Sequence, residues 1–157
     1  NAPFEGADPV GPTPVQVGGP PILAGVMGPK AMARAAHWAD GVYSFSMGGS
    51  AAETAGFFGM AEKAWQDAGR TTAPQKVGGF WYCLADNAEE KMKDYVYDYL
   101  KILGENIARP VANSMKNFDK FAIKDTLAEM AATGCEEVFL CSATDELSEL
   151  DRLLEIL

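Results

Sequence analysis

Small residues gather in one turn, Ala24-Gly25-Val26-Met27-Gly28, where backbone groups rather than side chains could do chemistry. Pro29 follows directly and suits the first position of a helix, where a missing N–H costs nothing. Amide groups at the start of a helix bind anions such as phosphate. The turn therefore predicts a phosphate site made of backbone N–H groups. The alternative is an ordinary strand-to-helix turn in which glycine only relieves strain, and the residues alone favour neither interpretation.

Other candidates for chemistry are weaker. Lys30 stands beside the turn and could add a positive charge, but a solvated helix lysine is the simpler interpretation. Gly48-Gly49-Ser50 is a second loop-to-helix entry and a second anion candidate. His37 is the single histidine, and we assign it no role, because a histidine beside Trp38 in a helix is more often a packing or surface residue. The sequence holds no paired carboxylates, nucleophile elbow or G-x-G-x-x-G at a convincing place.

Composition narrows the class of protein. Lys and Arg number 13 against 22 Asp and Glu, a net charge of −9, which argues against nucleic acid or an anionic membrane as partner. No apolar run approaches the roughly 20 residues of a membrane span. Cys83, Cys135 and Cys141 form no C-x-x-C pair. We expect them to be reduced and buried, in a cytoplasmic protein without a histidine metal cluster.

Four apolar runs predict strands, at residues 22–25, 42–46, 76–84 and 137–141. Residues 1–21 are rich in Pro and Gly and read as an extended lead-in, with a short hairpin around Phe4-Glu5-Gly6. A helix follows each strand, so the sheet is expected to be parallel. Four units are too few to close a (β/α)8 barrel. The pattern fits either an open doubly wound sheet or half of a barrel.

The helices are predicted from apolar stripes and end signals. The first begins at Pro29, the second is capped by Ser50 with Glu53 in a capping box, and the third runs over 88–108 after an Asn87 cap, with Pro110 ending it. Two more cover about 119–133 and 145–157. The expected inward residues, helix by helix, are Ala31, Ala35 and Trp38; Phe57, Ala61, Ala64, Trp65 and Ala68; Met92, Val96, Tyr99, Leu100 and Leu103; Ile123, Leu127, Met130 and Ala131; and Leu147, Leu150, Leu154 and Leu157.

Several of these segments, in this order, resemble the C-terminal half of bacterial-luciferase-like flavin-dependent oxidoreductases. The likeness extends from about Phe4 to Leu157. It rests on Pro20-Pro21-Ile22-Leu23-Ala24-Gly25, Gly28-Pro29-Lys30-Ala31, Ala35-Ala36, Ala39-Asp40-Gly41 and the run 131–138, Ala-Ala-Thr-Gly-Cys-Glu-Glu-Val.

The resemblance implies an α/β fold that is the C-terminal half of a TIM barrel. Residues 22–157 would then supply strands five to eight, as four parallel βα units. It further implies FMN or coenzyme F420 as cofactor, and hydride transfer or flavin-mediated oxygenation of a small-molecule substrate. The cofactor site would include Ala24, Gly25, Val26, Met27 and Gly28. Many relatives have Gly or Ser where Val26 and Met27 stand, so phosphate binding would rest on backbone N–H groups.

On this reading the ends of the second and third strands, Ser44, Ser46 and Met47 and then Trp81, Tyr82 and Cys83, lie at the active-site end of the barrel. Core packing is the simpler interpretation of Phe80, Trp81 and Cys83. The alternative function is a non-catalytic half-barrel module that binds a phosphate ligand or a partner chain. In either case we expect the chain to associate with the N-terminal half of the barrel or with itself, because four strands leave two open sheet edges.

Overall fold

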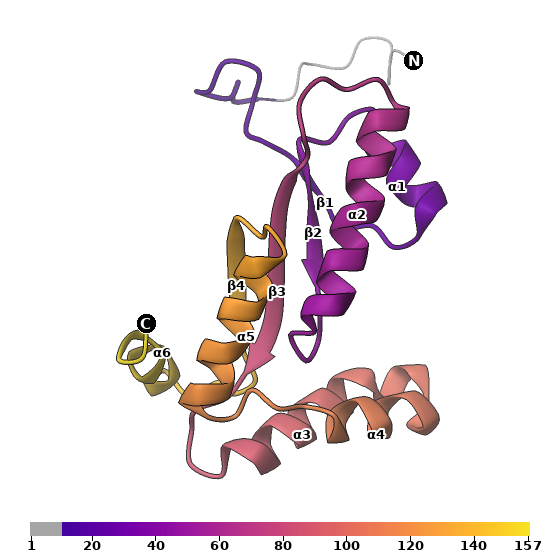
Figure 1. Cartoon of the computed structure of the whole chain (residues 1–157). Helices are drawn as coiled ribbons and strands as arrows, with labels where there is room; N and C mark the ends of the chain where they lie inside the picture. Colours follow the sequence, from indigo (N-terminus) through magenta and orange to yellow (C-terminus); the bar gives the residue numbers. More distant parts are fainter. Residues whose placement is uncertain (1–10) are drawn as a thin grey trace.

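A computed structural model describes residues 11–157 and contains one sheet of four parallel strands (Figure 1). The strands are β1 (Leu23–Ala24), β2 (Gly41–Phe45), β3 (Gln75–Tyr82) and β4 (Glu137–Ser142), and they are neighbours in chain order. All three pairings are parallel, which confirms the predicted arrangement of βα units. Residues 11–22 carry no helix or strand. The hairpin predicted around Phe4-Glu5-Gly6 lies outside the described residues.

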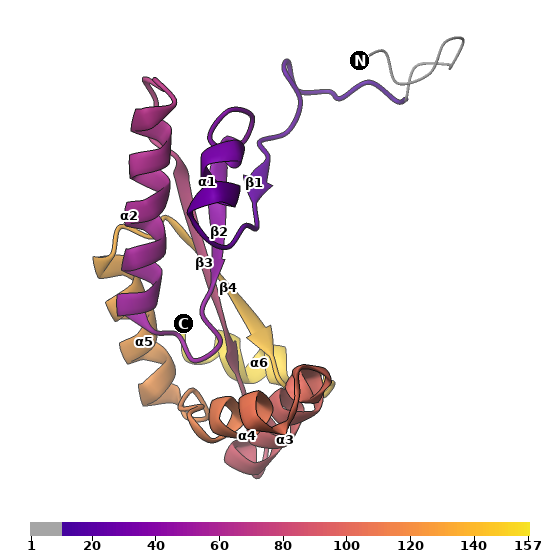
Figure 2. The same ribbon diagram turned by 90° about the vertical axis from the view of Figure 1, so that its right-hand side faces the viewer.

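The helices are placed unequally around this sheet. They are α1 (Pro29–Ala35), α2 (Ala51–Asp67), α3 (Ala88–Leu100), the 3-10 turn η1 (Lys101–Leu103), α4 (Glu105–Asn113), α5 (Lys120–Ala132) and α6 (Ser148–Leu154). Figure 2 shows α2 and α5 along one face of the sheet, and α3 and α4 beyond the carboxyl ends of the strands. None of these helices is long and apolar enough to cross a bilayer.

The two faces of the sheet therefore have different surroundings. On the face that carries α2 and α5, Val42 and Phe80 are fully buried. Phe45, Gly79 and Phe139 share one row across the opposite, inner face. Phe139 is 47% exposed there, and its ring meets Tyr43 edge-on at 5.7 Å between centroids. Part of the inner face is thus apolar and uncovered within residues 11–157.

The strands begin and end slightly differently from the prediction, for local reasons. β1 is shorter at both ends, and at its start the N–H of Ile22 donates to the Asp40 carboxylate at 2.8 Å rather than to a neighbouring strand. β3 ends at Tyr82 because the N–H of Cys83 donates to the carbonyl of Asn117 rather than to β4. β2 starts one residue early, at Gly41, where there is no space for a side chain beside Gln75.

The first two helices agree with the prediction except in which aromatics point inward. Trp38 is exposed because α1 ends at Ala35, and the inward positions belong to Met32, Ala35, Ala36 and Ala39. Ser50 caps α2 as predicted and accepts from the N–H of Glu53 at 3.3 Å. On α2, Ala61, Ala64 and Trp65 are buried as expected, whereas Phe58 is the buried phenylalanine and Phe57 is only partly buried.

The predicted single helix over 88–108 is wrong. Gly104, at φ 102°, separates α3 and η1 from α4, so the chain folds back as a helical hairpin. Pro110 lies inside α4 rather than ending a helix, because Ala108 and Ala112 on the same helix pack into the core that Val96 and Leu100 form on α3. Tyr99 and Leu103, predicted inward, are exposed. Asn87 adopts a left-handed conformation (φ 57°) and its side chain caps nothing.

The last two helices differ in how well their stripes were predicted. Asp119 caps α5, and Ile123 and Met130 are buried as expected, but Thr126 takes the inward position in place of Ala131, which is exposed. The leucine stripe predicted to face inward on the final helix is wrong, because the residues that pack against the sheet are Glu149 and Leu153. The exposed side chains are Leu147, Leu150, Leu154 and Leu157.

Candidate functional site

The carboxyl ends of the four strands meet at one edge of the sheet, since all of them are parallel. The loops that leave this edge include the predicted turn after β1, residues 46–50 after β2, and the chain that enters α3 after β3. In Figure 1 the α3–α4 hairpin lies beyond this edge. Ligand sites of parallel α/β folds form at this edge, so we build the candidate site here.

The predicted turn is divided between core and surface. Ala24 is buried among residues of α1 and α2 and points to the helix side of the sheet. Gly25, Val26 and Met27 line a cavity of about 230 Å³ together with Phe45 and Glu53 of the next βα unit and with Tyr43, Ser44 and Phe57. Gly28, at φ 80°, is the residue that caps α1.

The backbone of this turn is open to an approaching group. A Cβ added at Gly25 or at Gly28 would meet no atom within 4 Å. No side chain caps the first N–H groups of α1, and Pro29 contributes none. Because α1 has only seven residues, its dipole adds little, and any anion here would depend on the individual amides. Lys30 is exposed beside the turn.

Glu53 places a negative charge in the same cavity. Its carboxylate accepts from the Ser46 hydroxyl at 2.8 Å, and the Ser46 oxygen accepts from the N–H of Ser50 at 2.8 Å. In the predicted capping box, the Glu53 carboxylate would accept from the N–H of Ser50; here the Ser46 oxygen accepts from that N–H, and the Ser46 hydroxyl donates to Glu53. This arrangement ties the end of β2 to the start of α2, and it disfavours an anion beside the Glu53 carboxylate.

A larger cavity of about 960 Å³ adjoins the turn. Met27 and Glu53 line both cavities. The aromatic wall of the larger cavity is formed by Phe45, Trp81 and Tyr99. The Phe45 and Trp81 rings meet edge-on at 5.0 Å, and Trp81 meets Tyr99 at 5.2 Å. Met47, Val111, Ser114 and Met115 complete the apolar part, and Lys116 and Glu129 form a 3.7 Å ion pair at the cavity.

Asn117 fixes the loop that carries Ser46 and Ser50. It is fully buried, its amide donates to the carbonyl of Gly48 at 3.1 Å, and it accepts from the Thr126 hydroxyl at 2.8 Å. Gly49, at φ 71°, packs close to Thr126. A Cβ added at Gly49 would lie 2.3 Å from the methyl group of Thr126. The loop that held the second anion candidate, Gly48-Gly49-Ser50, is therefore held in place by α5 and the chain before it.

The remaining sequence candidates are divided between the core and the two cavities. Ser44 and Tyr82 are buried in the core side of the sheet, while Ser46, Met47 and Trp81 line the larger cavity. All three cysteines are free thiols, as expected, but only Cys83 is fully buried. Burial raises the pKa of the Cys83 thiol, which keeps it protonated at neutral pH. His37 is exposed, and among residues 11–157 no cluster of His, Cys, Asp and Glu could hold a metal ion.

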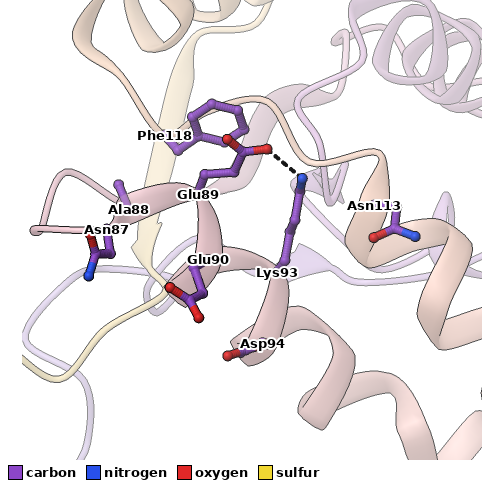
Figure 3. Close-up of a pocket in the computed structure, with 8 residues that line it drawn as sticks. All are labelled: Asn87, Ala88, Glu89, Glu90, Lys93, Asp94, Asn113 and Phe118. Atoms are coloured by element: carbon purple, nitrogen blue, oxygen red, sulfur yellow. Dashed lines mark hydrogen bonds and ion pairs between the residues drawn. The ribbon is translucent and has the colours of Figure 1, made fainter.

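A separate polar hollow lies between the start of α3 and the end of α4 (Figure 3). It measures about 660 Å³ and is lined mainly by Glu89, Glu90, Lys93 and Asp94 of α3, with Asn113 and Phe118 opposite. Lys93 pairs with Glu89, as the dashed line in Figure 3 marks. The hollow is lined by no Ser, Thr, Cys or His and shares no lining residue with the two cavities at the sheet edge, so it is separate from the candidate site.

The sequence matches a known family over residues 7–136, the luciferase-like monooxygenases. The chain belongs to the luciferase-like monooxygenase family. No curated protein matches it. Among solved structures, an F420-dependent secondary alcohol dehydrogenase in complex with an F420-acetone adduct matches with a TM-score of 0.65 and 14% identity. The match covers 87% of this chain and 48% of the dehydrogenase, so this luciferase-like chain spans about half the length of that structure. The fold is thus half of a luciferase-like TIM barrel.

Sequence reasoning missed the part of the site that comes from the α3–α4 hairpin. The sequence predicts Tyr99 on the inward face of a single helix and residues 110–118 as a loop with at most a short helical turn, whereas α4 extends to Asn113. Only the position of Gly104 in the middle of an otherwise regular pattern could have revealed the break. Glu53 was predicted as a capping residue, and its presence in the cavity depends on how α2 sits over the end of β2.

Proposed function

We propose that this chain is the C-terminal half of a flavin- or F420-dependent oxidoreductase of the luciferase-like family. The observation that carries the proposal is the coincidence of two findings at one sheet edge. The turn Gly25–Gly28, with accessible backbone, opens onto the same edge as a cavity large enough for a small molecule. Family membership supports FMN or F420 as cofactor. When bound, such a cofactor supplies hydride transfer or flavin-mediated oxygenation, chemistry that needs few protein side chains.

In this proposal the backbone at Gly25–Gly28 holds the phosphate of the cofactor. The absence of a side-chain cap on α1 and the open space at Gly25 support it. Glu53 disfavours this phosphate site, because its carboxylate faces the same cavity. One oxygen of that carboxylate accepts from Ser46. The phosphate would have to lie on the Gly28 side of the turn. We place the protein in the cytoplasm, where free cysteines such as these are kept reduced.

The site is incomplete by itself. The inner face of the sheet and the outer face of α6 expose Phe139 and a leucine stripe, and the matched dehydrogenase is about twice as long. We propose that an N-terminal half of the barrel, or a second copy of this chain, covers these surfaces. Turnover is expected only in that assembly, because the ring of the cofactor would need loops from both halves. The second candidate is a non-catalytic half barrel that binds a phosphate ligand or a partner.

Titration of the chain with FMN and with F420, followed by absorbance and fluorescence, tests the proposal. Gly25→Val crowds the turn without a strained φ, and we expect cofactor affinity to fall tenfold or more, about 1.4 kcal/mol. Glu53→Gln removes the opposing charge and should strengthen binding. Lys30→Ala is the matched control and should change little, because Lys30 is exposed beside the turn. A chain that takes up neither cofactor would favour the non-catalytic half barrel, and unchanged affinity in Gly25→Val would remove the turn from the site.

A further inference from the structure

We propose that a hollow at the amino ends of the strands binds a small molecule with one carboxylate group. The hollow measures about 410 Å³, within the range of known small-molecule sites, roughly 300–1,000 Å³. It is lined by the C-terminal part of α2 and by residues 70–74, the loop that enters β3, and we call it the Arg70 hollow. Figure 1 shows this loop at the end of the sheet opposite to the α3–α4 hairpin, so the proposal does not depend on the proposed function.

Trp65 lines the Arg70 hollow and carries a buried N–H group that is not hydrogen-bonded. The residue is 1% exposed, and its indole N–H has no partner among residues 11–157. Buried polar groups of proteins are nearly always hydrogen-bonded, because an unmade bond leaves the cost of removing the group from water uncompensated. An acceptor oxygen of a ligand in the hollow would supply the missing bond.

Arg70 contributes a positive charge whose position is fixed by the protein. Its Nη1 donates to the carbonyls of Ala36 and Ala39, both at 3.0 Å, at the end of α1. Its guanidinium also lies over the Trp65 ring, 5.6 Å from the centroid. No acidic side chain among the residues that the structure describes forms an ion pair with Arg70. The charge and the buried N–H therefore lie side by side, and both are available to one anionic ligand.

The groups around Arg70 favour a carboxylate over a more highly charged anion. Thr71 and Thr72 add two exposed hydroxyl groups to the lining. Glu62 also lines the hollow, but its charge is already paired with Lys76. One planar guanidinium matches the single charge and the planar shape of a carboxylate. A phosphate dianion would lack a second cation in a chain whose net charge is −9.

The rest of the lining suits a short apolar body. Ala73 and the buried Pro74 also line the hollow, and neither side chain carries a polar atom. A hydrocarbon chain or ring beside them would lose contact with water, which favours binding. The ligand class that we infer is a monocarboxylic acid with a short chain or a single ring.

An NMR titration of the ¹⁵N-labelled 157-residue chain with benzoate tests the proposal. Each tryptophan side chain gives its own N–H signal, and through-bond assignment identifies that of Trp65 without any variant. We expect benzoate to shift this signal and to bind at least tenfold more tightly than benzamide, which has the same shape without the charge, or than inorganic phosphate. A Trp65 signal that benzoate leaves in place would overturn the proposal, as would equal binding of benzoate and benzamide or of benzoate and phosphate.

Two pairs of variants locate the binding. Thr72→Asp places a negative charge at the exposed edge of the hollow and should lower benzoate affinity tenfold or more, whereas Thr72→Asn, of similar size and uncharged, should change it little. Arg70→Gln should also lower the affinity tenfold or more, and Arg109→Gln, which removes the same charge from α4, should not. Equal losses within either pair would place benzoate elsewhere and overturn the assignment. The Thr72 pair decides alone if Arg70→Gln does not fold, because Arg70 also bonds to the end of α1.

Discussion

The helices α2 and α6 both have apolar stripes, yet the fold buries only one of them. On α2 the inward residues lie against α1 and the sheet, and Trp65 is 1% exposed. Of the predicted stripe, Leu150 and Leu154 lie on α6 while Leu147 and Leu157 flank it, and all four are at least 58% exposed. The helix is held to the sheet by Leu153 and by the buried Glu149. An amphipathic pattern therefore indicates that a helix has an apolar face, but not that residues 11–157 cover that face.

The largest effect that distinguishes the two helices is expected from truncating their apolar residues. Phe58→Ala on α2 should lower the free energy of unfolding by about 3–5 kcal/mol, because it leaves a cavity beneath the buried face of the helix. Leu150→Ala on α6 should stay within about 0.5 kcal/mol. Urea unfolding measures both, at a protein concentration where both variants have the same mass in solution. Similar losses would show that something already covers the α6 stripe.

A second prediction concerns how α6 is attached. Glu149 accepts from the N–H of Leu84 and pairs with Arg152 at 3.3 Å. Glu149→Ala leaves the partly buried N–H of Leu84 without its protein acceptor and should cost about 1–3 kcal/mol in urea unfolding. Glu149→Gln keeps an acceptor oxygen and is the matched control, with a smaller loss. If Glu149→Ala and Glu149→Gln lower the free energy of unfolding equally, the hydrogen bond from Leu84 does not hold α6 in place.

The smallest predicted effect is a dependence on pH. Hydrogen bonds from Lys91 and Arg152 lower the pKa of Glu146, the residue that links α3 to the start of α6. A lowered pKa in the folded state means that the stabilisation is complete above the ordinary value of 4.5 and is lost as the pH falls through the lowered value. Thermal unfolding of wild type and Glu146→Gln between neutral and acidic pH should show a steeper loss in wild type below about pH 4.5. If the stability of wild type and of Glu146→Gln changes with pH in the same way, the ion pairs of Glu146 do not contribute to stability.

The order of strands and helices could be predicted because local signals determine it. Gly28 with Pro29, Ser50, Gly69, Asp119 and Gly134 mark the ends of helices, and these signals act over a few residues. The direction of each stripe could not be predicted as well. Trp38 and the leucines of the final helix fit the 3.6-residue spacing of an apolar helix face. Whether such a face is buried depends on elements that are distant in the sequence, and the spacing does not show where those elements lie.

The candidate site divides in the same way. Gly25, Val26 and Met27 were expected at the carboxyl end of β1, and they line a cavity there. The expected cofactor contact of these residues stays a prediction. Tyr99, Ser114 and Met115 enter the larger cavity only because Gly104 reverses the chain between α3 and α4. A residue that reaches a site through such a reversal has no local signal that marks it.

We propose that this half of a luciferase-like barrel associates with a partner that covers its inner sheet face and the α6 stripe. Sedimentation equilibrium of the 157-residue chain over a wide concentration range, with flavin- and F420-dependent turnover measured on the same samples, tests this most directly. We expect mass above the 16.8 kDa monomer that grows with concentration, and no turnover unless an N-terminal half is added. A monomer at every concentration that turns over substrate by itself would contradict the claim.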